Sequence, residues 1–163
     1  MVIKKYILNN IVKLDKLYNT YPNEATYYSK LSIIELCGWI ELSMDKIVEH
    51  FANKHLKTQP YKDMFNSLKD KNYGFDYKAN FRKMLCKTIG MHKMEILEIK
   101  LNKNGDITKL DGILCSLKTL RNDAAHTYID VTKTYQAPSV TISQLNDIYS
   151  ILKHFSREIK NIK

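Results

Sequence analysis

The stretch LKTLRNDAAHTY, residues 117–128, continues an apolar pattern that begins at Leu110. Apolar residues recur at three- and four-residue spacing at Leu110, Ile113, Leu114, Leu117, Leu120, Ala124 and Tyr128. This spacing predicts an amphipathic helix over about residues 107–128. Arg121 takes the next position of the apolar stripe, and burying an unpaired guanidinium is costly. We therefore expect Arg121 to have a partner, to face a cleft or to lie at an interface.

The rest of the chain shows the same helical periodicity. It predicts helices over about 2–18, 26–55, 61–69, 77–99 and from Thr141 to the C-terminus. The last helix would begin at TISQ, a capping box with Thr141 as N-cap and Gln144 at N3. Residues 129–139 lack a helical period and predict a loop or a short extended piece. The predicted fold is an all-α, up-and-down bundle of about five to six helices, forming one domain over residues 1–163.

The charge balance is strongly basic. Lys plus Arg number 26 against 17 for Asp plus Glu, which gives a net charge of +9. Such an excess favours a polyanionic partner, most simply RNA or DNA. The alternative is that the lysines keep a helical protein soluble. Only Arg82, Arg121 and Arg157 are arginines, so an arginine within a core stripe is a marked choice.

The cysteines and the N-terminal segment indicate the compartment. Cys37, Cys86 and Cys115 are odd in number, lack C-x-x-C spacing and lie among apolar residues. We interpret them as small buried side chains in a reducing compartment, not as disulfides or zinc ligands. The first residues show no signal-peptide pattern, and no 18-residue apolar run is present. We expect a cytoplasmic protein that has no membrane partner and needs no cofactor or metal.

The polar residues of the 117–128 stretch fall on different sides of the predicted helix. Arg121 and His126 are five positions apart, about 140° of rotation, so they do not face each other on one helix. Asn122 and His126 share a face, so the amide can orient the imidazole. Ala124 and Ala125 let another helix approach closely. Pairing this helix with its own copy across a two-fold axis would bring Arg121 and His126 together.

An arginine and a histidine at such an interface suit RNA cleavage. The ribose 2′-hydroxyl must lose a proton, the phosphorane must be stabilised and the 5′-oxygen must gain a proton. Histidine transfers protons near neutral pH, and a guanidinium binds phosphate through two parallel hydrogen bonds. This chemistry needs no metal, and the sequence shows no convincing cluster of metal ligands.

The pattern R-N-x-x-x-H-x-Y, formed by Arg121, Asn122, His126 and Tyr128, lies near the end of a long helix in a small helical chain. It resembles the HEPN superfamily (higher eukaryotes and prokaryotes nucleotide-binding). The resemblance implies a metal-independent endoribonuclease that acts as a homodimer, with paired motifs forming a basic cleft. Many members are toxins of toxin–antitoxin pairs or effectors of anti-phage defence.

The resemblance also implies supporting residues and a regulator. In the subgroup with H-x-Y, a nucleotidyltransferase antitoxin adds AMP to the tyrosine, which corresponds to Tyr128. An acidic residue from an earlier helix often supports the Arg–His pair, and Glu41 is the candidate, with Glu35 behind it. A solvated glutamate at the edge of the apolar stripe is the alternative for Glu41.

A second segment with RNA-binding character is NYGFDYKANFRK, residues 72–83. Its aromatic residues alternate with Lys78, Arg82 and Lys83, so rings can stack on bases while the cations hold phosphates. The alternative is a turn followed by the start of an amphipathic helix. The remaining histidines have no comparable setting, and we expect them at the surface: His50, His55, His92 and His154.

Two other functions fit the same residues. Arg121 can be half of a buried ion pair, His126 a helix-terminal histidine interacting with the helix dipole, and Tyr128 a core aromatic. The protein would then be a catalytically inactive helical module that binds nucleic acid or a protein partner. It could also be a structural subunit whose charge serves solubility.

Overall fold

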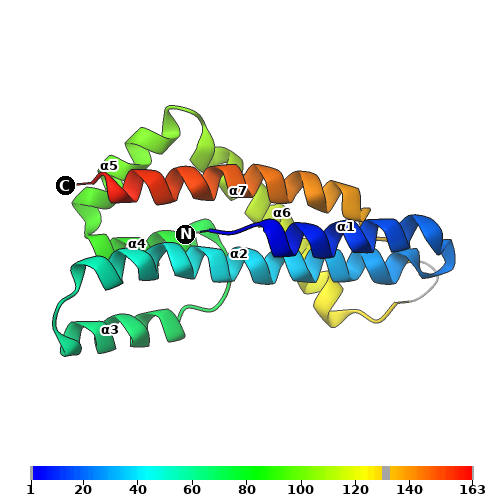
Figure 1. Ribbon diagram of the computed structural model, residues 1–163, viewed down its shortest axis with the longest axis horizontal. Helices are drawn as coiled ribbons and strands as arrows, with labels where there is room; N and C mark the ends of the chain where they lie inside the picture. Colours follow the sequence, from blue (N-terminus) through cyan, green and yellow to red (C-terminus); the bar gives the residue numbers. More distant parts are fainter. Residues whose placement is uncertain (1, 130–132, 163) are drawn as a thin grey trace.

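The computed structural model describes residues 2–129 and 133–162, and these residues form seven α-helices and no β-strand (Figure 1). The helices are α1 (Lys5–Thr20), α2 (Ala25–His55), α3 (Gln59–Asp70), α4 (Arg82–Ile89), α5 (Met91–Asn102), α6 (Asp106–His126) and α7 (Pro138–Lys160). A 3₁₀ turn, Pro22–Glu24, precedes α2, and a π-helical turn, Tyr77–Phe81, precedes α4. The predicted all-α bundle is confirmed.

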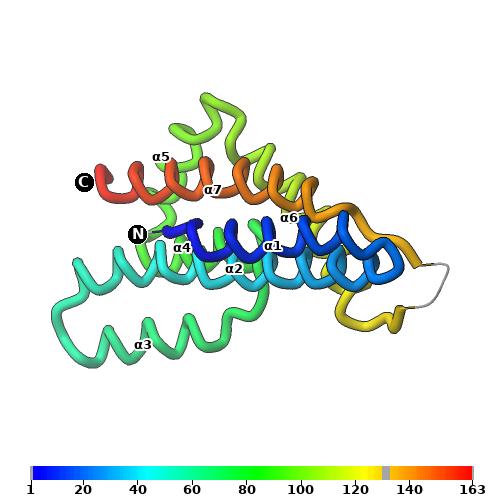
Figure 2. The backbone as a smooth tube through the Cα atoms, turned by 45° about the vertical axis from the view of Figure 1, so that its right-hand side comes forward, coloured from blue at the N-terminus to red at the C-terminus, as the bar shows by residue number. Residues whose placement is uncertain are grey.

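α2 and α7 run side by side along most of the molecule, and α1 packs against both over the half where α2 begins (Figures 1 and 2). α3 runs back along the second half of α2, and α4 and α5 cover the end where α7 finishes. α6 packs against α2, α5 and α7. Because α7 contacts α1 and α2, helices from the two ends of the sequence close the bundle together.

All seven helices contribute to one continuous hydrophobic cluster. Its aromatic part joins α7 to the π-helical turn, with the ring centroids of Phe81 and Phe155 5.3 Å apart. Near the N-terminus, the Trp39 indole donates a hydrogen bond of 2.9 Å to the Ile3 carbonyl. The aromatic packing therefore fixes the π-helical turn, which precedes the basic residues of α4.

Two predicted helix boundaries are wrong. The helix predicted over 77–99 is interrupted at Gly90, whose φ of +89° belongs to a region that favours glycine. The last helix begins at Pro138 instead of Thr141, because the fixed φ of proline suits the first helical position. Thr141 is buried inside α7, where its hydroxyl lies 3.2 Å from the Ser32 hydroxyl of α2.

The end of α6 also differs from the prediction. α6 stops at His126, and Thr127 is extended, with its carbonyl accepting a hydrogen bond of 2.7 Å from Lys30. Tyr128 therefore lies outside the helix and is 79% exposed, so its predicted place in the apolar stripe is wrong. Residues 129 and 133–137 are irregular, as predicted, whereas part of the predicted loop, 130–132, lies outside the described residues.

The structure also tests the predictions about cysteine burial and membrane-spanning segments. Cys37 is buried, but Cys86 is half-buried and Cys115 is exposed, so the prediction of three buried thiols holds only for the first. None of the helices in the described part of the chain has the length and hydropathy needed to cross a membrane.

Candidate active site

Arg121 is half-buried on α6, between the fully buried Leu117 and Ala124. Its Nη1 donates a hydrogen bond of 3.2 Å to the Asn122 side-chain oxygen. Within residues 2–129 and 133–162 it forms no ion pair with a carboxylate. The other two arginines do: Arg82 Nε lies 2.7 Å from Glu98 Oε1, and Arg157 Nε lies 3.2 Å from Glu158 Oε1. The guanidinium of Arg121 thus remains available to a ligand.

A cleft of about 190 Å³ lies beside Arg121. One wall comes from α6, and the other from the loop that follows α3 together with the π-helical turn. The lining residues are Tyr73, Gly74, Phe75, Asp76, Asn80, Lys118, Arg121 and Asn122. Lys118 pairs with Asp76 across the cleft at 3.2 Å. Of the three settings expected for Arg121, the structure shows a cleft.

Glu41 does not line this cleft but contacts Gly74, which does. The Gly74 amide donates a hydrogen bond of 2.6 Å to Glu41 Oε1, so the carboxylate holds the loop and does not contact Arg121. Burial raises the pKa of the Cys37 thiol to about 12, while the Arg121 charge lowers it and the Glu41 charge raises it. Both charges therefore lie within electrostatic range of the same thiol. Glu35 is half-buried and makes no hydrogen bond or ion pair with the described residues.

His126 is exposed at the last position of α6 and does not line the Arg121 cleft. In the part of the chain that the structure describes, Asn122 makes no hydrogen bond to the His126 imidazole, and its side-chain oxygen accepts one from Arg121. A single chain therefore does not bring Arg121 and His126 together. The catalytic roles of Arg121, Asn122 and His126 stay predictions.

Asp123 fixes the chain that leaves the motif, and the sequence analysis missed it. Its Oδ1 lies 2.8 Å from Lys133 Nζ and accepts a hydrogen bond of 3.2 Å from the Thr127 hydroxyl. Its carbonyl accepts a hydrogen bond of 3.4 Å from the Tyr135 hydroxyl. The hydrogen bond from Lys133 is the main cause that holds the pKa of Asp123 below its usual value. The four-residue spacing to Thr127 at a helix end was the signal available in the sequence.

The predicted RNA-binding residues lie along a second cleft. Lys78, Arg82 and Lys83 line a volume of about 810 Å³ between α4 and α5, together with Lys87 and His92. Two of the three are held by carboxylates: Lys78 lies 2.8 Å from Asp111, and Arg82 pairs with Glu98. In the part of the chain that the structure describes, Lys83 and Lys87 are exposed and form no ion pair. These two lysines are therefore the available phosphate ligands of this cleft.

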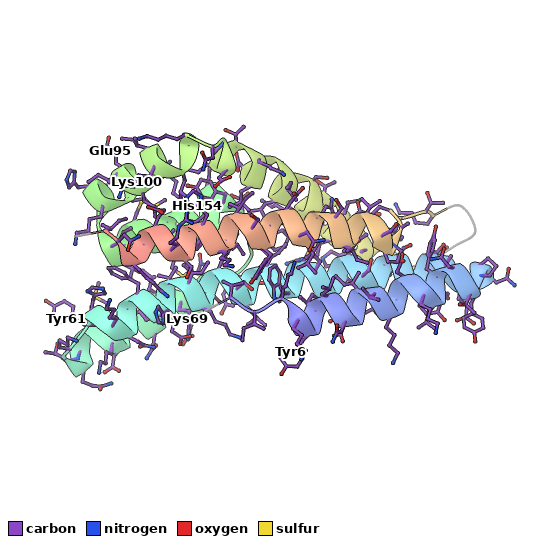
Figure 3. All side chains as sticks on the ribbon, turned by 45° about the horizontal axis from the view of Figure 1, so that its top comes forward. Tyr6, Tyr61, Lys69, Glu95, Lys100 and His154 are labelled. Carbon is purple, nitrogen blue, oxygen red and sulfur yellow. The ribbon has the colours of Figure 1, made fainter. Side chains whose placement is uncertain are left out.

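The prediction that His154 lies at the surface is wrong. Its side chain is only 16% exposed on α7 (labelled in Figure 3). Nδ1 lies 2.5 Å from Asp106 Oδ2, and Nε2 lies 3.7 Å from Glu158 Oε1. The imidazole joins the start of α6 to α7, and this structural contact removes it from the surface. His50, His55 and His92 are exposed, as predicted.

The described residues contain no group of three His, Cys, Asp or Glu side chains arranged to hold a metal ion. In the comparison with protein families, the family model described as RiboL-PSP-HEPN matches residues 4–162, which span all seven helices. Neither the curated proteins nor the solved structures contain a match to the sequence.

Proposed function

The chain belongs to the RiboL-PSP-HEPN family, and from this premise we propose that it is a metal-independent endoribonuclease with Arg121 and His126 combined at a two-fold dimer interface. One observation carries the proposal. Arg121 is a half-buried guanidinium at a cleft, and among the described residues its hydrogen bond goes to the Asn122 amide and to no carboxylate. A phosphate would supply the missing anionic partner.

In the proposed reaction, the ribose 2′-oxygen attacks phosphorus and the bond from phosphorus to the 5′-oxygen breaks. His126 of one copy accepts the 2′-hydroxyl proton, and the imidazolium of the other copy protonates the leaving 5′-oxygen. Arg121 binds the non-bridging oxygens, with its plane held by Asn122. The products are a 2′,3′-cyclic phosphate and a 5′-hydroxyl, with no metal-bound species involved.

Two copies are needed because Arg121 and His126 lie on different sides of α6. The end of α6 offers a surface for pairing: His126 and the small Ala125 are exposed, whereas Ala124 is buried in the core. Pairing α6 with its own copy would place the imidazole of one chain near the guanidinium of the other. The homodimer is thus part of the proposed site.

We also propose a biological role as a cytoplasmic toxin or anti-phage effector. Tyr128 is 79% exposed two positions after His126, so its hydroxyl is accessible to a modifying enzyme. A nucleotidyltransferase antitoxin could transfer AMP from ATP to this hydroxyl, releasing pyrophosphate. The new phosphodiester would introduce negative charge beside the RNA site and oppose substrate binding.

Incubating the purified protein with RNA in EDTA tests the chemistry. Cleavage should persist and leave a 2′,3′-cyclic phosphate, whereas Arg121→Ala and His126→Ala should each lower the rate by about 10²–10⁴-fold. The matched controls are Arg157→Ala and His50→Ala, which replace exposed residues away from the motif. An absolute requirement for Mg²⁺ or Mn²⁺ would contradict the metal-free mechanism.

The second candidate is a catalytically inactive module that binds RNA. The cleft lined by Lys83 and Lys87 favours it, because this cleft lies outside the motif. Such a module would bind RNA with a strong salt dependence, and Arg121→Ala would leave RNA intact just as the parent does. The same cleavage assay therefore separates the two functions.

A further inference from the structure

Tyr73 is 82% exposed, yet its backbone is firmly held. It lies in the loop between α3 and the π-helical turn, where its carbonyl accepts a hydrogen bond of 2.7 Å from Asn80. The next residue, Gly74, has a φ of +102° and donates its amide to Glu41. Glycine is favoured at this φ, so the loop shape is specific. An aromatic ring is thereby presented to solvent from a fixed position.

Three clefts meet at Tyr73. The first, of about 190 Å³, holds Arg121 and Asn122. The second, of about 340 Å³, is lined by Lys71, Lys83 and Lys87. The third, of about 430 Å³, is lined by three acidic residues of α2 and α3, Glu41, Asp45 and Asp70, and by one cation, Lys69, which pairs with Glu49. Tyr73 therefore lines all three clefts: the Arg121 cleft, the second cleft, which is basic, and the third, which is acidic.

The charges of these clefts give an RNA backbone one favourable direction. Lys71, Lys83 and Lys87, which form no ion pair within residues 2–129 and 133–162, attract phosphates, and the acidic cleft repels them. Burial is the main cause that raises the pKa of Asp45 in this cleft to about 6, the Glu41 carboxylate adds to it and the Lys69 charge opposes it. A strand that leaves Arg121 is thus directed across Tyr73 towards the lysines.

We infer that single-stranded RNA runs from the cleft of about 340 Å³ that is lined by Lys83 and Lys87, across Tyr73, to Arg121. The Tyr73 ring stacks on the base next to the bound phosphate. This inference rests on the proposed function and adds a specificity-determining residue and a substrate class to it. Stacking requires an unpaired base, because a base within a duplex already stacks on its neighbours. The protein should therefore prefer single strands.

Binding measurements with uncut RNA test the role of Tyr73. In a His126→Ala background, the probe is a single-stranded RNA oligonucleotide that contains 2-aminopurine. Tyr73→Ala should weaken binding about tenfold and abolish the quenching of 2-aminopurine, and Tyr73→Phe should retain both. The matched control is Tyr61→Ala, because Tyr61 is 64% exposed on α3 and lines none of the three clefts (Figure 3).

The lysines are tested by salt dependence. In the same background, replacing both Lys83 and Lys87 by Ala should reduce the slope of log affinity against log salt by about one to two. Lys13→Ala, which removes an exposed lysine of α1, should lower affinity less and uniformly. The His126→Ala protein, in which Tyr73 is unchanged, should bind duplex RNA of the same sequence more weakly than the single strand.

The outcomes separate this inference from the proposed function. Equal affinities for Tyr73→Ala and Tyr61→Ala, or no RNA binding by either, would overturn the RNA path. Binding that depends on Tyr73, together with a parent protein that leaves RNA uncut, would support the path and contradict the nuclease. Circular dichroism of each variant confirms that the helices have formed.

Discussion

A histidine lies near each end of α6, His154 of α7 near its start and His126 at its last position, and their surroundings are opposite. Near its start, His154 lies between Asp106 and Glu158. At its end, His126 is exposed, and Arg121 contacts an amide but, in the described part of the chain, no carboxylate. The two histidines differ in their carboxylate neighbours: His154 has two, whereas His126 has none among the described residues.

Arg82 and Arg121 repeat this contrast. Glu98 accepts from Arg82 and from the Tyr77 hydroxyl at 2.7 Å, so one carboxylate satisfies two groups of the fold. A cation that is already paired this way is poorly available to a substrate, whereas an unpaired one in a cleft favours an incoming anion. Charge pairing, more than residue type, therefore separates structural cations from candidate catalytic ones.

Among variants that keep both Arg121 and His126, the largest expected effect comes from giving Arg121 the surroundings of Arg82. Asn122→Asp supplies a carboxylate where the amide oxygen now accepts from Arg121. Because the new charge competes with the RNA phosphate, the cleavage rate should fall by about 10²-fold while thermal stability stays level or rises. Rates and melting temperatures should be compared with those of Asn122→Ala, which should lose less activity. Equal rates for Asn122→Asp and the parent would break the comparison.

A smaller effect is expected from removing a carboxylate at the paired end. Glu98→Gln leaves the buried Tyr77 hydroxyl and Arg82 without their ionic acceptor. Since the Arg82 side chain is 48% exposed, solvent screening reduces the cost, and the free energy of unfolding should fall by about 2 kcal/mol. Urea unfolding measures it, with the exposed Glu95→Gln as control.

The same urea unfolding measurement should be made on Arg121→Ala, for comparison with Glu98→Gln. Arg121→Ala removes a cation that has no carboxylate partner among the described residues, so the free energy of unfolding should stay level or rise. A loss as large as that of Glu98→Gln would show that Arg121 is structural.

The smallest change in the free energy of unfolding is expected for Asp45, a carboxylate that lies near other carboxylates. Burial, followed by the charge of Glu41, raises the pKa of Asp45 to about 6. A raised pKa in the folded state means that the stabilisation is complete below the unfolded pKa, near 4, and is lost as pH rises through about 6. Asp45→Asn should therefore raise the free energy of unfolding by about 1 kcal/mol at pH 7, after allowance for solvent screening, and by less at pH 4. Unfolding at both pH values checks the sign, with Asp63→Asn as control.

Local patterns predicted most of the fold. The apolar spacing predicted α2 and α6 within a few residues, because a buried stripe on a helix is a property of consecutive residues. The break at Gly90 was missed because glycine within a helical pattern does not reveal its φ. Thr141 looked like an N-cap because TISQ matches a capping box, and this local pattern does not reveal the contact with Ser32, 109 positions earlier in the sequence.

The candidate site was predictable in its residues and less so in its contacts. Arg121 stood out because a charge interrupts an apolar stripe, and the structure places it at a cleft. The hydrogen bond between Glu41 and Gly74 joins residues 33 positions apart, and the contact between His154 and Asp106 joins residues 48 positions apart. Such pairs depend on how helices pack, which periodicity within one helix does not contain.

The packing of α7 against α1 and α2 has a consequence for synthesis. The ribosome produces the chain from α1 onwards, so Arg121 and His126 leave it before α7 has been made. Until then, the core that holds α6 lacks the buried side chains of α7, among them Leu145, Ile148, Leu152 and Phe155. A nascent chain therefore carries the whole motif without the scaffold that orients it. For the nuclease proposed above, the motif would reach its folded arrangement only after translation has passed α7, so the growing polypeptide would spare the messenger RNA that encodes it.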